Sequence, residues 1–225
     1  MYHEPSMKQT GFLHQIGQLE KAMHAGLPGQ DAQLLMAPAH RDELIRNSQG
    51  ISHARRSAVL ILLFPGEQGL LSTAFIKRVE YDGVHSGQVA FPGGKHEEED
   101  PDLVATALRE AREEAGILPE TVTVCGELSS LFVPPSNFII SPVIAYCPIK
   151  PVFTPDPAEV AEIFTLPLSH FTDPSNLVER DFHPRSGNRI RVPGYQAGEY
   201  FIWGATAMIL SELIALAVKA GVVKG

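Results

Sequence analysis

Cysteine is scarce in this chain of 225 residues, which contains only Cys125 and Cys147. Two thiols in a chain of this size favour reduced core residues over a disulfide framework. The sequence also lacks a Cys-x-x-Cys pair and a His-Glu-x-x-His motif, so neither a structural nor a catalytic zinc site is expected. The run Pro92-Gly93-Gly94-Lys95 does not have the spacing of a P-loop.

Positive charge is also in short supply, because 18 lysines and arginines stand against 26 aspartates and glutamates, giving a net charge of −8. A nucleic-acid groove requires a basic stripe, so we expect no nucleic-acid partner. The net charge does not argue against binding of a small-molecule nucleotide, because a metal ion can supply positive charge locally.

Long hydrophobic runs are rare. The longest covers residues 201–223, and Gly204, Glu212 and Lys219 interrupt it. This pattern favours a strand followed by a packed helix over a membrane span. The first 15 residues contain no apolar core of a signal peptide. We therefore expect a cytoplasmic protein with no membrane partner.

The remaining composition, 44% hydrophobic and 20% charged, is typical of a soluble globular protein. Residues 1–50 are predicted to be an N-terminal helical extension packed on the domain, and residues 51–225 to be that domain. The helical prediction rests on apolar residues at steps of three and four, namely Phe12, Ile16, Leu19 and Met23. The extension could instead pack on a second copy of the chain, so a homodimer stays among the expected partners.

Apolar runs predict several strands. Residues 58–64 form a continuous run that suits a strand buried on both faces, and residues 70–78 read as a second strand paired with it. Further strands are predicted at residues 122–132, 139–147 and 159–164. A strand that ends at Trp203 is predicted to lead into a last helix.

The stretch from Gly87 to Ile117 carries the strongest chemical signal. Asp100 is predicted to cap a helix that begins at Pro101 and runs to about Ala115. On this helix three glutamates share one face, namely Glu110, Glu113 and Glu114. The neighbouring stripe is apolar and should pack on the sheet; it comprises Leu103, Val104, Ala107, Leu108, Ala111 and Ala115.

Three clustered carboxylates repel one another, at a cost of roughly 0.2–0.5 kcal/mol for each pair on an isolated helix. One interpretation is an ordinary solvated helix face, with arginines screening the charges. The other is a site for a hard divalent cation, Mg²⁺ or Mn²⁺, which oxygen ligands suit. The glycine pair that precedes the helix favours the second interpretation, because glycine lets a phosphate or another backbone come close.

These residues resemble the Nudix box, G-x5-E-x7-R-E-U-x-E-E-x-G-U, in which U is a bulky aliphatic residue. The matching positions are Gly94, Arg109, Glu110, Glu113, Glu114, Gly116 and Ile117. Three departures occur: Asp100 replaces the first glutamate, one extra residue precedes Arg109, and Ala111 replaces the bulky aliphatic residue. The first two departures, and the preceding Phe91-Pro92-Gly93-Gly94, are similar to the coenzyme A pyrophosphatase subgroup.

The resemblance implies an α/β fold, a Nudix-type α/β/α sandwich with a mixed β-sheet, and metal-dependent hydrolysis of a nucleoside diphosphate derivative. It implies that the metals are held by the Gly93 carbonyl with Glu110, Glu113 and Glu114. Arg109 is expected to orient the glutamates. The proton of the attacking water is expected to pass to Glu110 or to Glu159, with Glu162 as a further candidate.

By the same resemblance the substrate is coenzyme A or an acyl derivative, cut to 3′,5′-ADP and (acyl-)4′-phosphopantetheine. Candidate substrate-binding residues are Lys77, Arg78, His85 and Gly94. The subgroup has a further arginine two residues before the histidine, where this chain has Gly83. ADP-ribose, a dinucleotide or a nucleoside triphosphate is therefore the alternative substrate, and a catalytically silent nucleotide-binding module is the alternative from another class.

Overall fold

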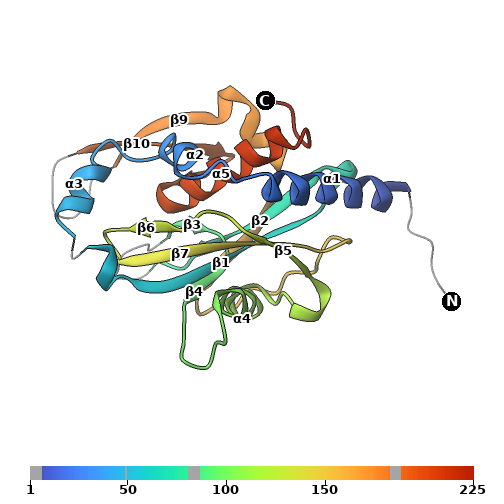
Figure 1. The fold of residues 1–225 in the computed structure, drawn as a ribbon, viewed down its shortest axis with the longest axis horizontal. Helices are drawn as coiled ribbons and strands as arrows, with labels where there is room; N and C mark the ends of the chain where they lie inside the picture. Colours follow the sequence, from blue (N-terminus) through green and yellow to red (C-terminus); the bar gives the residue numbers. More distant parts are fainter. Residues whose placement is uncertain (1–6, 49, 81–86, 183–188) are drawn as a thin grey trace.

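The computed structural model describes residues 7–48, 50–80, 87–182 and 189–225 of the chain (Figure 1). The α-helices are α1 (Met7–His24), α2 (Gln30–Leu34), α3 (Arg41–Arg46), α4 (Leu103–Ala115) and α5 (Gly204–Lys219). Short 3₁₀ turns occur at Ile51–His53, Glu67–Gly69, Pro119–Thr121, Leu168–Thr172 and Pro174–Asn176.

A large mixed sheet forms the middle of the molecule. Its strands are β1 (Arg55–Pro65), β2 (Leu71–Arg78), β3 (Val89–Ala90), β4 (Gly93–Lys95), β5 (Thr123–Glu127), β6 (Leu131–Val133), β7 (Phe138–Tyr146) and β8 (Val160–Pro167). β1 and β7 run parallel along nine residue pairs, and the other pairings are antiparallel. The predicted strand over residues 122–132 is two strands in the structure, β5 and β6, which pair with different parts of β7.

The hairpin of β1 and β2 opens part-way along its length. The two strands pair only through residues 63–65 and 71–73, next to the turn that joins them. Beyond that point β3 pairs with β2, while β4 pairs with β1. The chain from Val89 to Lys95 therefore fills the gap between the diverging strands, and this brings Gly93 and Gly94 alongside β1.

Helices cover both faces of the sheet, as Figure 1 shows, with α4 on one side and α1 and α5 on the other. Alternate side chains of β1 enter two separate cores. Ile61 and Leu63 pack with α1 and α5, whereas Leu60 and Leu62 pack with the alanine stripe of α4. This confirms the predicted α/β/α sandwich and the prediction that residues 58–64 are buried on both faces.

A second sheet of three strands lies beyond α5 and was not predicted. It consists of β9 (Leu177–Phe182), β10 (Ile190–Ala197) and β11 (Tyr200–Trp203), all antiparallel. The chain turns between β10 and β11 at Gly198, where φ is +60°. The strand that enters α5 is β11, as the interrupted apolar run predicts.

A buried carboxylate links the chain around α2 to the rest of the molecule, in addition to the packing of α1 in the core. Glu212 of α5 is fully buried, and its Oε1 accepts hydrogen bonds from the backbone N–H of Gly29 at 3.1 Å and of Ser129 at 3.2 Å. Its other oxygen accepts a bond from Gln33 Nε2 at 2.7 Å. The division into residues 1–50 and 51–225 stays a prediction.

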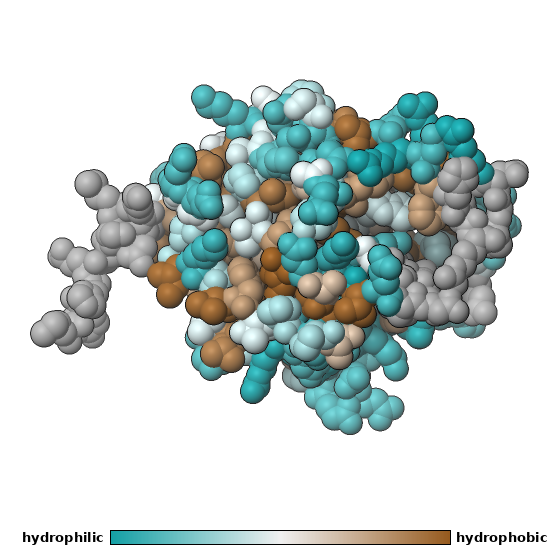
Figure 2. All heavy atoms as spheres, turned by 180° about the vertical axis from the view of Figure 1, so that it is seen from behind, coloured by the Kyte–Doolittle hydropathy of each residue, from teal (hydrophilic) through white to brown (hydrophobic). Residues whose placement is uncertain are grey.

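The two cysteines are free thiols, as expected. Among the residues that the structure describes, no helix has the length and apolar character needed to cross a membrane. On the face drawn in Figure 2, hydrophobic residues form several small groups among hydrophilic ones.

Candidate active site

Helix α4 carries the candidate site, and its start differs from the sequence prediction. The N-cap is Asp102, whose Oδ1 accepts a hydrogen bond from the N–H of Ala105 at 2.7 Å. Asp100, the predicted cap, is instead buried in the loop before the helix. Two aspartates flank Pro101, and the sequence alone did not distinguish the capping one. The C-terminal end agrees with prediction, since Gly116 is left-handed with φ of +68°.

The alanine face of α4 packs on the sheet, and this brings Glu110 and Glu114 over the glycines of β4. A Cβ added to Gly94 would lie 2.4 Å from the carboxylate atoms of Glu110, and one added to Gly93 would lie 2.3 Å from the carbonyl oxygen of Ala58. A side chain at Gly93 would therefore clash with the backbone of β1, and one at Gly94 would displace the carboxylate of Glu110.

Glu114 is the most deeply buried carboxylate of the site, with a side chain 2% exposed. Its Oε2 accepts a hydrogen bond from the N–H of Gly93 at 2.8 Å. Its Oε1 lies 2.9 Å from Arg78 Nη2 as an ion pair, yet receives no hydrogen bond of acceptable geometry. Burial raises the pKa of Glu114 to about 7, against the opposing effect of Arg78.

Arg78 lies at the end of β2 and contacts two oxygens of the site. The same Nη2 that pairs with Glu114 also donates a hydrogen bond to the carbonyl oxygen of Gly93 at 2.9 Å. The side chain is 23% exposed. The carbonyl predicted as a metal ligand is thus hydrogen-bonded to the arginine predicted to bind substrate.

Arg109 connects the loop before α4 to the glutamates. Its Nε and Nη2 donate to the two oxygens of Asp100 at 2.9 and 3.0 Å, and Nη1 donates to Glu110 at 2.9 Å and to Glu113 at 3.0 Å. Nη2 also donates to the carbonyl oxygen of Lys95 at 3.0 Å. These bonds hold the pKa of Asp100 well below its usual range. Sequence reasoning missed this pairing because it assigned Asp100 to the cap.

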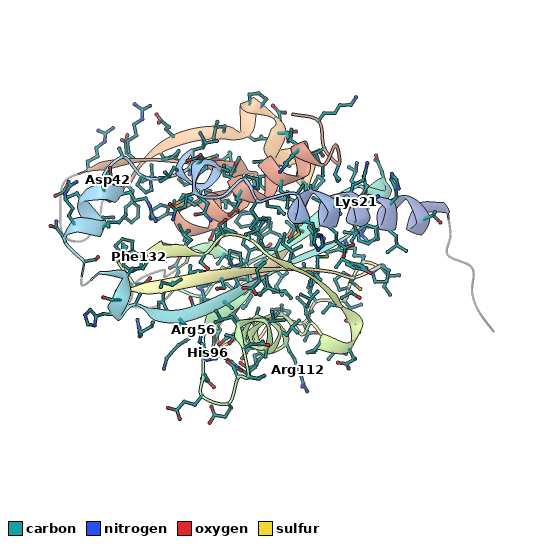
Figure 3. All side chains as sticks on the ribbon, in the orientation of Figure 1. Lys21, Asp42, Arg56, His96, Arg112 and Phe132 are labelled. Atoms are coloured by element: carbon teal, nitrogen blue, oxygen red, sulfur yellow. The ribbon has the colours of Figure 1, made fainter. Side chains whose placement is uncertain are left out.

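Asp100 also accepts a hydrogen bond from a side chain of α4. Asp100 Oδ2 accepts a hydrogen bond from the hydroxyl of Thr106 at 2.9 Å, and the hydroxyl oxygen of Thr106 lies 2.9 Å from His96 Nδ1. Figure 3 shows His96 beside α4. Asp100 therefore fixes the orientation of Arg109 through a set of bonds that spans the loop and the first turns of the helix.

The three glutamates on one helix face differ in exposure. The side chain of Glu110 is 14% exposed and that of Glu113 is 58% exposed, against 2% for Glu114. Burial raises the pKa of Glu110, while Arg109 opposes that rise. In the described part of the chain, no three acidic, histidine or cysteine side chains converge as a ready-made metal site.

Glu159 reaches this region through the segment between β7 and β8. The N–H of Thr154 donates to the carbonyl of Ala115 at 3.0 Å, and the N–H of Asp156 donates to the carbonyl of Glu114 at 3.2 Å. These bonds satisfy carbonyls at the end of α4 and place the segment along it. Glu159 is exposed, and its charge raises the pKa of both Glu110 and Glu114, so it lies within electrostatic reach of them.

Three further predicted site residues, Lys77, Glu162 and His85, are not placed beside the glutamates of α4. Lys77 and Arg78 are adjacent in β2, so their side chains point to opposite faces of the sheet. The ammonium of Lys77 lies 5.8 Å from the ring of Tyr200, on the face covered by α5, and the Tyr200 hydroxyl donates to Glu162 at 2.5 Å. The structure thus separates Lys77 and Glu162 from Glu114. His85 lies outside the described residues.

Comparison with known proteins identifies the family. The model of the NUDIX domain matches residues 54–185, which is 132 of the 225 residues. The chain belongs to the Nudix family. It is 40% identical over 172 residues to the protein named "Uncharacterized Nudix hydrolase NudL" from Enterobacter sp. (strain 638), covering 74% of this chain and 84% of that one. A relative with the same name from Cronobacter sakazakii is 38% identical over 181 residues, covering 77% and 89%.

Solved Nudix structures are more distant. RenU, a Nudix hydrolase from M. smegmatis, aligns with a TM-score of 0.46 and 22% identity over 53% of this chain and 74% of that one. The Nudix domain of Shewanella oneidensis NrtR, solved with ADP ribose, aligns with a TM-score of 0.42 and 17% identity over 58% and 85%. The family membership makes this chain a Nudix pyrophosphohydrolase, an enzyme that acts on small nucleotide substrates.

Nudix hydrolases generally need a divalent metal such as Mg²⁺ or Mn²⁺. The oxygens around α4 fit such an ion in two respects. Glu114 presents a buried oxygen that lacks a well-directed hydrogen bond, and Gly94 leaves space against Glu110 that a Cβ would fill. Carboxylate and carbonyl oxygens are the ligands that hard divalent cations prefer.

Proposed function

We propose that this Nudix enzyme hydrolyses the pyrophosphate of coenzyme A or acyl-coenzyme A, giving 3′,5′-ADP and (acyl-)4′-phosphopantetheine. The observation that carries the chemistry is the buried carboxylate of Glu114 beside the Gly93 carbonyl. What supports the substrate is sequence resemblance, namely Phe91-Pro92-Gly93-Gly94 and the lengthened spacing before Arg109.

In this proposal Glu110, Glu114 and the Gly93 carbonyl hold Mg²⁺ or Mn²⁺. Glu113 is more exposed and turned toward Arg109, so it is a peripheral ligand. When bound, the cation neutralises the charge of the pyrophosphate and makes water a usable nucleophile near neutral pH. Arg109 keeps Glu110 and Glu113 oriented through its bonds to Asp100, a positioning task.

Proton removal from the attacking water falls to Glu159 in this proposal. Glu110 is engaged by Arg109 and covered by Gly94, whereas Glu159 is exposed at the edge of the same charged group. A general base must be near the water and free to accept its proton. Arg78 and Gly94 would contact the substrate phosphates, since a guanidinium suits bidentate contact with phosphate oxygens.

Product analysis on a small panel tests the substrate. Coenzyme A, acetyl-coenzyme A, ADP-ribose, NADH and dGTP are each incubated with Mg²⁺ and with Mn²⁺, and products are identified by chromatography and mass spectrometry. The proposal expects 3′,5′-ADP from coenzyme A, with the other substrates slow. Faster turnover of ADP-ribose, NADH or dGTP would assign that compound as the preferred substrate, and the proposed metal-dependent hydrolysis would still hold. Gly83 makes ADP-ribose the second candidate, because the coenzyme A subgroup has an arginine there.

A further inference from the structure

Arg78 contacts two oxygens that the proposed function assigns to a divalent cation. Its Nη2 lies 2.9 Å from Glu114 Oε1 and donates to the Gly93 carbonyl at 2.9 Å. The second oxygen of Glu114 is held by the Gly93 N–H, so the carboxylate and the carbonyl form one rigid pair of acceptors. One guanidinium nitrogen sits between them.

Two cations cannot share this place. A divalent ion contacts oxygen at about 2.0–2.6 Å, and a guanidinium nitrogen at hydrogen-bond distance from both oxygens covers their approach. Two like charges a few ångströms apart in a buried environment also repel strongly. Binding of the ion at these oxygens therefore requires Arg78 to leave them.

We propose that Arg78 is an exchangeable counter-ion, which neutralises Glu114 in the absence of metal and is released toward the substrate phosphates when a divalent cation binds. This inference rests on the proposed function for the location of the cation. The exchange gives a reason for the order of events: the arginine becomes available to a phosphate only after the cation that neutralises the pyrophosphate is bound.

The surroundings of Arg78 allow such a movement. Its backbone is fixed, because its N–H donates to the carbonyl of Gln88 at 3.0 Å and β2 pairs with β8 up to Val160. Its side chain is partly exposed and long, so the guanidinium can swing toward solvent without a change of backbone. The buried charge of Glu114 explains why a counter-ion is needed at all, since an unpaired buried charge is costly.

Manganese affinity of matched variants tests the exchange. Arg78→Met removes the competing guanidinium, and Lys77→Met is the control, because it removes the same charge from the next residue on the opposite face of the strand. Free Mn²⁺ is titrated by electron paramagnetic resonance at one fixed pH for all variants. We expect Arg78→Met to lower the apparent Kd by about fivefold or more, the equivalent of one displaced ion pair, and Lys77→Met to leave it unchanged.

Each other result has a defined meaning. An unchanged Kd in Arg78→Met overturns the exchange, and so does a raised Kd, which would show that Arg78 supports the metal site. A wild-type protein that binds no Mn²⁺ would overturn the proposed metal site itself, which separates the two failures. Equal tightening in both variants would indicate net charge alone and also overturn the exchange.

A second measurement uses the unmodified protein and does not depend on the stability of a variant. The ¹⁵N signals of the Arg78 guanidinium, assigned by their loss in Arg78→Lys, are followed as Mg²⁺ is added to protein freed of metal with chelator. We expect an ion-paired guanidinium with slowed rotation before addition, and a solvated one at saturation. A guanidinium signal that Mg²⁺ leaves unchanged would contradict the exchange.

Discussion

Single residues set the electrostatics of the site, and Glu114 is central among them. It combines 2% exposure with a raised pKa and contacts from both Gly93 and Arg78. Glu159 has the opposite character, being exposed at the edge of the same charged group. This contrast predicts that the two carboxylates perform separable tasks.

Glu114→Gln and Glu159→Gln distinguish binding of the ion from proton transfer. We expect Glu114→Gln to weaken Mn²⁺ binding and to lower kcat by about 100-fold or more, because a cation ligand is lost. Glu159→Gln should lower kcat by a similar order while leaving the Mn²⁺ affinity near that of wild type. Glu120→Gln, an exposed glutamate beyond α4, is the control. Retained turnover in Glu159→Gln would return the role of base to Glu110.

The raised pKa of Glu114 also predicts a pH dependence of stability. Burial raises the pKa from 4.5 to about 7, so the protonated form is favoured in the folded state. The contribution to stability is therefore full below pH 4.5 and is lost as the pH rises through 7. The loss is on the order of 3 kcal/mol, since one pKa unit corresponds to about 1.4 kcal/mol.

Urea unfolding with chelator present measures this effect. The free energy of unfolding of wild type minus that of Glu114→Gln should decrease between about pH 5 and pH 8, because only wild type loses the protonated carboxyl. A difference that stays constant over this range would show that the carboxylate is not desolvated as the structure indicates.

At the scale of elements, α4 is fixed at both ends by groups outside the helix. Asp102 caps its start, and the segment through Thr154 and Asp156 donates to carbonyls at its end. Gly94 of β4 then leaves room for the carboxylate of Glu110. The precision of the glutamate positions thus depends on three separate parts of the chain.

Asp102→Ala and Asp100→Ala should separate capping from positioning. Loss of the cap bond to Ala105 should reduce the free energy of unfolding by about 1 kcal/mol and leave turnover within about twofold of wild type. Loss of Asp100 removes the bidentate partner of Arg109 and should lower kcat by about 10-fold or more. Kinetics and urea unfolding of both variants measure this. If Asp100→Ala kept the kcat of wild type, Asp100 would not be the residue that orients Arg109.

Local sequence signals accounted for α4 and the strands of the main sheet, because period and glycine placement are local properties. They misplaced the helix cap, since two aspartates beside Pro101 offer equal capping chemistry. The alternation of side chains along a strand already predicts that Lys77 and Arg78 lie on opposite faces of the sheet, yet both were predicted to bind the substrate. The hydrogen bonds from Thr154 and Asp156 to α4 could not be predicted from local sequence patterns, because they join segments about forty residues apart.

At the scale of the whole molecule, Glu212 connects distant segments, because it bonds α5 to the chain around α2 and to the turn after β5. Sequence reasoning noted this residue only as an interruption of an apolar run. It also missed the second sheet, because β9 reads Leu-Val-Glu-Arg-Asp-Phe and lacks an alternating apolar pattern. Such features depend on tertiary contacts that a single sequence does not display.

Glu212→Ala should therefore loosen the N-terminal helices. Three donors would lose their acceptor in a buried place, and we expect a loss of about 3 kcal/mol or more in the free energy of unfolding. Limited proteolysis should then cut faster around Gly29. Lys219→Met is the control, because it removes an exposed bond of 2.7 Å to the Gly26 carbonyl in the same region and should cost less than about 1 kcal/mol. Equal proteolysis of wild type and Glu212→Ala would contradict this role.

The two sides of β2 have different neighbours, with Arg78 beside the glutamates of α4 and Lys77 beside Tyr200. A deletion of one residue within this strand would turn every following side chain to the other face. It would bring a neighbouring residue against Glu114 and leave the arginine under Tyr200. Related sequences should consequently vary in this strand by substitution, while insertions and deletions gather in the turn at Glu67–Gly69.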